Sequence, residues 1–217
     1  MLGVVDRFSI DIDRADKLFH VLSEIVDHPL LDDSPRVALS ATLSVTSLDL
    51  GASVRTLCAS DQMIGANVCL RSQFEALIRS VWALHRATDL QVEKLSTQQL
   101  TLDTQQGAKN IPLAAEMLEE LDKIPHLAQL TSALNEFKGG AWQPLNSYVH
   151  AGLYAVLHTR FGGPPSLLNQ IFRISNGFGM LAFNNLGILT GISGIQAEIR
   201  AATASFSSVL PDYRSDT

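Results

Sequence analysis

The helical character of the chain is clearest in the segment Leu70-Arg71-Ser72-Gln73-Phe74-Glu75-Ala76-Leu77-Ile78-Arg79-Ser80-Val81-Trp82. Within it, Leu70, Phe74, Leu77 and Val81 are separated by three or four residues, so they share one face of an α-helix. A run of this kind predicts an amphipathic helix, and no alternating apolar pattern long enough to predict a β-strand occurs elsewhere in the sequence. The sequence therefore predicts an all-α protein.

Segments with the same periodicity continue on both sides of this helix and are separated by prolines, glycines and short polar turns. We expect Ser34 to cap the helix that starts at Pro35, and Ser60 or Asp61 to cap the next one. We also expect Gly139-Gly140 to end one helix before another starts. The expected helices cover residues 13–27, 35–59, 61–87, 89–105, 112–121, 125–137, 141–160, 166–190 and 194–209.

The 217 residues show no internal repeat, low-complexity tract or change of composition that would mark a linker. A chain of this length can bury a core without help from metals or disulfides. We therefore expect a single-domain helical bundle over residues 1–217, with a core from about 34 to 209 and a mobile tail at 211–217. The charge-free run 178–195 approaches the length of a membrane span, but its asparagines and glycines favour a buried helix, so no membrane contact is expected.

Charge and cysteine content narrow the class of protein further. A formal net charge of -6 argues against a broad nucleic-acid-binding surface, although it leaves a small local basic site open. Cys58 and Cys69 have the spacing of neither a disulfide framework nor a zinc site, and no histidine pattern predicts a metal. The N-terminus lacks the features of a secretory leader. We expect a cytoplasmic protein without a metal or other cofactor.

A polar stripe runs beside the apolar face of the helix at 70–82. It contains Arg71, Glu75, Arg79, Trp82 and Arg86, which lie within about a quarter-turn of one another. Glu75 is spaced to pair with Arg71 and with Arg79, which would make a rigid anion-binding site. The alternative interpretation is a solvated face with weak ion pairs.

A second polar group is expected on the helix that the segment Gln143-Pro144-Leu145-Asn146-Ser147-Tyr148-Val149-His150-Ala151-Gly152 opens. Asn146, His150 and Tyr154 recur every four residues, so one continuous helix would stack them on one side. An imidazole in such a setting can act as a general acid or base, with a nearby guanidinium stabilising an anionic intermediate. The alternative is a partly buried histidine whose nitrogens are satisfied by its neighbours.

These two segments together resemble the HEPN-type helical proteins of bacterial toxin and phage-defence systems, and an uncharacterised bacterial helical family related to them. The resemblance covers roughly residues 60–194, including Arg173-Ile174-Ser175-Asn176-Gly177 before an apolar helix. HEPN ribonucleases carry a histidine four to six residues after an arginine, at a site formed in a dimer. His150 matches that histidine, but no arginine stands at those positions before it.

The resemblance implies a homodimer that cleaves RNA without a metal. His150 would be the acid or base, Arg71 and Arg79 would bind the phosphate, and Glu75, Asn146 and Tyr154 would orient these groups. The alternative is a non-catalytic helical module that uses the same arginines to bind a small anionic ligand such as a nucleotide, or that binds a protein partner encoded in the same operon.

Overall fold

A computed structural model describes residues 10–212, and over this range the chain forms ten α-helices, three short 3-10 segments and no strand. The predicted all-α class is confirmed. The helices are α1 (Ile12–Val26), α2 (Pro35–Ala59), α3 (Met63–His85), α4 (Asp89–Leu95), α5 (Leu102–Gly107), α6 (Ala114–Leu121), α7 (Ala128–Val149), α8 (Leu153–Phe161), α9 (Pro165–Thr190) and α10 (Ile195–Thr203).

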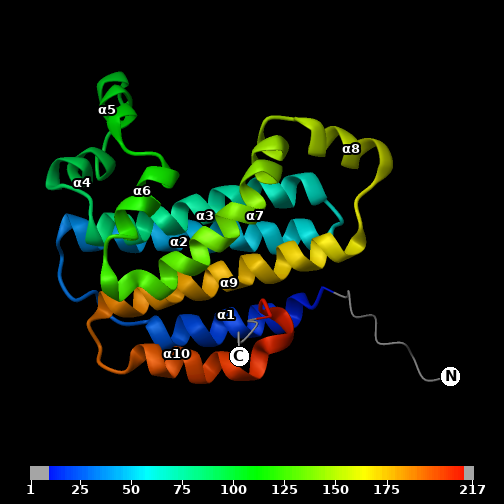
Figure 1. The fold of residues 1–217 in the computed structure, drawn as a ribbon. Helices are drawn as coiled ribbons and strands as arrows, with labels where there is room; N and C mark the ends of the chain where they lie inside the picture. Colours follow the sequence, from blue (N-terminus) through cyan, green and yellow to red (C-terminus); the bar gives the residue numbers. More distant parts are fainter. Residues whose placement is uncertain (1–9, 213–217) are drawn as a thin grey trace.

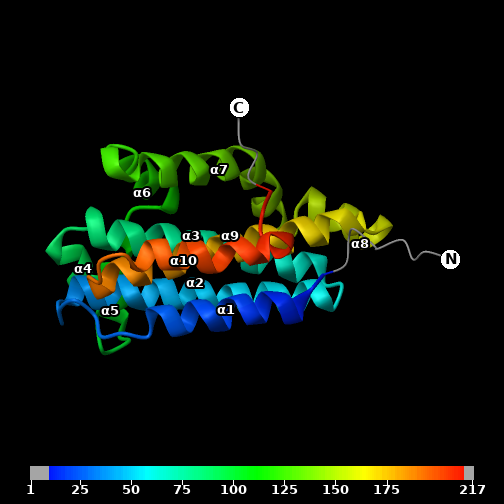
Figure 2. The same ribbon diagram turned by 90° about the horizontal axis from the view of Figure 1, so that it is seen from below.

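Helices α1, α2, α3, α9 and α10 run alongside one another and form the body of the molecule (Figure 1). Helix α7 crosses one side of this body, and Figure 2 shows it with α6 as a separate layer above α3 and α9. Helices α4, α5 and α6 gather at one end of the bundle, whereas α8 projects at the other end between α7 and α9. The predicted single-domain bundle is confirmed.

Helix α3 is the centre of the core, as its apolar stripe predicts. Leu70, Phe74, Leu77 and Val81 are all buried, because α2, α9, α6 and α7 pack around this helix. The core also includes α1, where Ala15, Leu18 and Leu22 are completely buried, so it begins earlier than the boundary near residue 34 that the sequence indicates. Most of the tail predicted at 211–217 lies outside the described residues.

A buried polar layer joins α2, α3 and α9. The Asn185 amide donates to the hydroxyls of Ser40 (3.0 Å) and Ser44 (2.9 Å), and Ser40 in turn donates to the Ser80 carbonyl at 2.8 Å. Small serine side chains let the helices approach closely while satisfying the buried amide. Of the described helices, only α2 is long and apolar enough to cross a membrane, and it is held in the core by these contacts.

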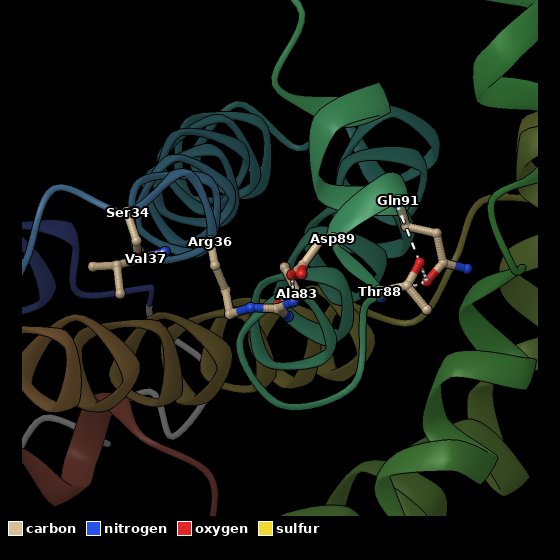
Figure 3. Close-up of polar contacts among 7 residues, drawn as sticks. All are labelled: Ser34, Arg36, Val37, Ala83, Thr88, Asp89 and Gln91. Carbon is tan, nitrogen blue, oxygen red and sulfur yellow. Dashed lines mark hydrogen bonds and ion pairs between the residues drawn. The ribbon is translucent and has the colours of Figure 1, made fainter.

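Side-chain caps fix the starts of α2 and α4 (Figure 3). The predicted cap at Ser34 is confirmed, because its hydroxyl accepts the Val37 N–H at 3.3 Å. Thr88 and Gln91 form a reciprocal capping box, in which each side chain accepts the other residue's backbone N–H. Both caps lie at the same end of the bundle.

Arg36 links three helices at this end (Figure 3). Its Nη1 donates to the Ala83 carbonyl near the end of α3, and its Nη2 donates to the Asp89 carboxylate at the start of α4, both at 2.8 Å. The C-terminal carbonyls of α3 therefore gain a donor, and α4 is fixed against α2.

Several predicted helix boundaries are wrong. Helix α3 starts after Gln62, not at Ser60 or Asp61, because Asp61 adopts a left-handed conformation (φ 56°) that turns the chain between α2 and α3. The helix predicted at 89–105 divides into α4 and α5, since α4 buries only Val92 and α5 buries nothing. Gly139-Gly140 lie inside α7, which is held by apolar packing on both sides of them.

Candidate functional site

The side chain of Arg71 joins α3 to α7. Its Nε and Nη2 donate to Oε1 of Glu75 at 3.0 and 2.6 Å, and its Nη1 donates to Oδ1 of Asn146 on α7. The guanidinium carbon lies 3.5 Å from the centre of the Trp142 ring, one turn before Asn146. The i, i+4 pairing of Arg71 with Glu75 is confirmed, and the contact between Arg71 and Asn146 brings the two predicted polar groups together.

The Arg71 guanidinium is held rigidly but keeps donors for a ligand. Its side chain is 15% exposed and that of Glu75 is 32% exposed. A guanidinium carries five N–H groups, and the described residues accept three hydrogen bonds from it. An anion at this point would therefore meet a preoriented positive charge with N–H groups still available.

His150 lies one turn beyond Asn146, at the C-terminal cap of α7. Its backbone N–H donates to the Asn146 carbonyl at 3.1 Å, so the helical register, and with it the shared face of Trp142, Asn146 and His150, continues to this residue. The imidazole is exposed, and no described residue forms a hydrogen bond with it. The exposed ring therefore lies one turn beyond the group of Arg71, Glu75, Trp142 and Asn146, which we call the Arg71 cluster.

Tyr154 does not complete the predicted stack, because α7 ends at Val149 and a new helix begins at Leu153. Ala151 takes a left-handed conformation (φ 51°), and an added Cβ on Gly152 would lie 2.7 Å from Oγ of Ser147. That hydroxyl accepts the Tyr154 N–H at 3.0 Å and so satisfies a donor in the first turn of α8. The prediction of one helix over 141–160 is wrong.

Tyr154 instead belongs to a second cluster, with Tyr148 and His158. The hydroxyl of Tyr148 lies 2.5 Å from Nδ1 of His158. The centre of the Tyr148 ring is 6.1 Å from the centre of the Tyr154 ring. Burial, with a smaller contribution from Tyr154, raises the pKa of Tyr148. All three line a cavity of about 910 Å³ between α7 and α9. The sequence signal that could have predicted this cluster is the four-residue spacing of Tyr154 and His158.

Arg79 is not part of the Arg71 cluster. It lies two turns further along α3, where its Nε is buried without a hydrogen-bond partner among the described residues. Glu75 forms its ion pair with Arg71, so the predicted pairing of Glu75 with Arg79 is absent from the described contacts. Trp82 and Arg86 continue the stripe but bond to Glu120 of α6. The predicted stripe on α3 therefore has two sets of partners: Arg71 contacts α7, whereas Trp82 and Arg86 contact α6.

The other titratable groups in the described part of the chain give no sign of a metal or thiol site. Among residues 10–212, no three His, Cys, Asp or Glu side chains group closely enough to hold a metal ion. Burial raises the pKa of the Cys58 thiol to about 12. Burial, and secondarily the neighbouring His126, lowers the pKa of His85, whose ring centre is 5.4 Å from that of His126.

The sequence profile of a family of unknown function, DUF6988, matches residues 44–212. The chain belongs to DUF6988. This match includes α3, α7 and α8, so every residue of the Arg71 cluster and of the Tyr148 cluster lies inside the DUF6988 region. Comparisons with curated proteins and with solved structures gave no match.

Proposed function

We propose that the protein is a HEPN-like component of a bacterial toxin or phage-defence system that cleaves RNA without a metal ion. In this proposal it acts in the cytoplasm as a homodimer. The observation that supports it is the hydrogen bond from Arg71 to Asn146, because it joins the Arg71–Glu75 pair on α3 to the helix that carries His150. The guanidinium missing from the His150 helix would thus be supplied by its neighbour.

The proposed reaction uses the ribose 2′-hydroxyl as the nucleophile. The neutral imidazole of His150 removes the hydroxyl proton, and the oxygen attacks the adjacent phosphorus. The free N–H groups of Arg71 stabilise the charge on the phosphorane, while Glu75 and Asn146 hold the guanidinium in place. The 5′-oxygen leaves with the proton from the His150 imidazolium, which gives a 2′,3′-cyclic phosphate and a 5′-hydroxyl.

The experiment is cleavage of end-labelled RNAs in the presence of EDTA. We expect the purified protein to cleave, His150→Ala to lose roughly a hundredfold or more in rate, and Arg71→Lys to lose less than Arg71→Ala. His28→Ala is the matched control, since His28 is also exposed but lies in the α1–α2 loop at the other end of the bundle (Figure 1). RNA left intact by the wild-type protein, or equal cleavage by His150→Ala, would refute the catalytic proposal.

Arg79 has a smaller role in this proposal than Arg71. Its Nε is buried, but the side chain as a whole is only half-buried, so we expect its terminal guanidinium nitrogens to contact the phosphate backbone. We expect Arg79→Ala to raise the RNA concentration needed for half-maximal rate and to change the maximal rate little. An equal loss of maximal rate in Arg79→Ala and Arg71→Ala would contradict this division of roles.

The second candidate is a non-catalytic module that binds a nucleotide, or a protein partner from the same operon, through the same cluster. It is favoured by the absence of an arginine four to six residues before His150 and by the formal net charge of -6. Stabilisation of the protein by a nucleotide in a thermal-shift assay, without RNA cleavage, would support it.

A further inference from the structure

The cavity between α7 and α9 has the form of a small-molecule site and is distinct from the Arg71 cluster. Its volume of about 910 Å³ lies within the usual range of ligand pockets, roughly 300–1,000 Å³. One wall comes from the apolar side of α7, including Phe137 and Leu145, and the opposite wall comes from α9, including Ile171 and Phe178. Arg71, Glu75 and His150 are not among the residues that line it.

Polar groups converge at one end of this cavity. Tyr148 and His158 hydrogen-bond to each other at 2.5 Å, and the half-exposed Tyr154 lies beside them. A phenol hydroxyl and an imidazole can each donate or accept, so this end can satisfy one neutral hydrogen-bonding group of a ligand. Of the described residues that line the cavity, none is Lys or Arg, whereas Glu136 and Asp212 are acidic. A ligand with a buried negative charge would meet these carboxylates, and the nearby cation, Arg173, is already paired with Asp212.

The sequence of α7 carries an independent sign that this space is used. Gly139 and Gly140 lie in the interior of the helix, where glycine is disfavoured. A Cβ at either position would meet nothing within 4 Å, so packing inside the protein does not require glycine there. Pro144, four residues later, cannot donate a backbone N–H to the Gly140 carbonyl. Gly140 and Pro144 both line the cavity, so α7 lacks this backbone hydrogen bond where it borders the cavity.

We propose that this cavity binds an uncharged, mainly apolar small molecule that carries a single hydrogen-bonding group. The apolar walls of α7 and α9 contact its body, and Tyr148 with His158 holds the polar group. Binding here is independent of RNA cleavage, because the Arg71 cluster faces away from this side of α7 and shares no residue with the cavity.

The test uses two fluorescent probes that share one scaffold. N-phenyl-1-naphthylamine is uncharged and has a single N–H, whereas 8-anilino-1-naphthalenesulfonate adds a sulfonate to it. We expect saturable binding of the neutral probe at one site per chain, and binding of the sulfonate that is weaker by roughly tenfold or more. Absence of saturable binding by the neutral probe, or equal binding of both, would overturn the proposal.

A pair of adjacent substitutions locates the site. Gly140→Leu adds a side chain on the cavity wall, whereas Gly139→Leu adds the same side chain at a position that does not line it. Both should keep or raise the thermal midpoint, because leucine favours a helix more than glycine does. We expect Gly140→Leu to weaken the neutral probe roughly tenfold and Gly139→Leu to leave it unchanged. Equal affinities in the two variants would place the probe elsewhere.

Two further variants separate the cavity from the exposed apolar surface of α8. Tyr148→Phe keeps the ring and removes the hydroxyl, and it should weaken the neutral probe several-fold. Phe161→Ser changes a 70% exposed side chain of α8 that does not line the cavity, and it should leave binding unchanged. If Phe161→Ser abolishes binding and Tyr148→Phe does not, the probe adsorbs on α8 and the proposal is wrong.

Discussion

The contact between Arg71 and Asn146 should stabilise the fold measurably, because it fixes α7 to α3. Arg71→Met removes the guanidinium but keeps a flexible apolar chain that can still lie on Trp142. The substitution removes the hydrogen bond to Asn146, the hydrogen bonds to Glu75 and the contact of the guanidinium carbon, 3.5 Å from the Trp142 ring centre. Only the contacts with Asn146 and Trp142 join two helices.

The expected size follows from these contacts. A hydrogen bond to a charged group contributes about 1.5–3 kcal/mol, and a partly buried cation–π contact about 0.5–2 kcal/mol. The Arg71 side chain is 15% exposed, so solvent screens these contacts little. Allowing for the apolar contact that methionine retains, Arg71→Met should lower the free energy of unfolding by about 2–4 kcal/mol. The i, i+4 pair with Glu75 should account for only about 0.5 kcal/mol of this.

The assay is urea unfolding followed by circular dichroism in two double-mutant cycles. The cycle of Arg71→Met with Asn146→Ala should give a coupling energy of about 1–2 kcal/mol, whereas the cycle with Glu75→Ala should give a few tenths. The second cycle is the control, since it tests a contact within one helix. A coupling to Asn146 no larger than the coupling to Glu75 would refute the view that this contact fixes α7 to α3.

Three other outcomes can be measured on the purified protein. Glu120→Ala should lower the free energy of unfolding by about 1–3 kcal/mol, because the buried Trp82 N–H loses the acceptor that it has at 2.6 Å. The control, Glu119→Ala, changes an exposed residue of α6 and should alter the free energy of unfolding by less than about 0.5 kcal/mol. Burial lowers the pKa of His85 in the folded state, so stability should fall as pH drops below the unfolded value of 6.5, and His85→Gln should reduce this fall in thermal midpoints taken from pH 8 to pH 5. The Cys58 thiol, with its pKa raised to about 12, should resist a disulfide reagent at pH 8 in the native protein and react after unfolding.

Local sequence signals predicted the elements whose structure depends on local contacts. The apolar stripe of α3 became the centre of the core, and Ser34 caps α2 as its position before Pro35 indicates. The pairing of Arg71 with Glu75 also follows from four-residue spacing on one helix. In each case the deciding interaction lies within about one helical turn, so the sequence contains it.

The position of the break between α7 and α8 could not be predicted from local sequence signals. Gly139-Gly140 and Pro144 are the strongest local breakers, yet the helix continues through them because Leu134 and Leu145 on either side are buried in the core. The chain turns instead at Ala151, a residue that rarely adopts a positive φ. Packing between helices therefore overrides local preference at Gly139-Gly140 and Pro144.

The pairing of Glu75 with Arg71 and not with Arg79 also depends on packing between helices. Glu75 is equally spaced from Arg71 and Arg79, and spacing alone does not choose between them. The choice is made by α7, whose Asn146 accepts a hydrogen bond from Arg71 and so holds that arginine beside Glu75. Since Asn146 and Arg71 are 75 residues apart in the sequence, their contact depends on how α7 crosses α3.

Helix α7 separates the two candidate sites because it presents different residues to each of them. Trp142, Asn146 and His150 follow one another every four residues on the side of the Arg71 cluster, whereas Leu145 and Tyr148 point to the cavity. A ligand in the cavity could act on the Arg71 cluster only by moving α7 itself, because no side chain belongs to both. If RNA cleavage and probe binding are both observed, the cleavage rate should therefore be the same with and without the bound neutral probe.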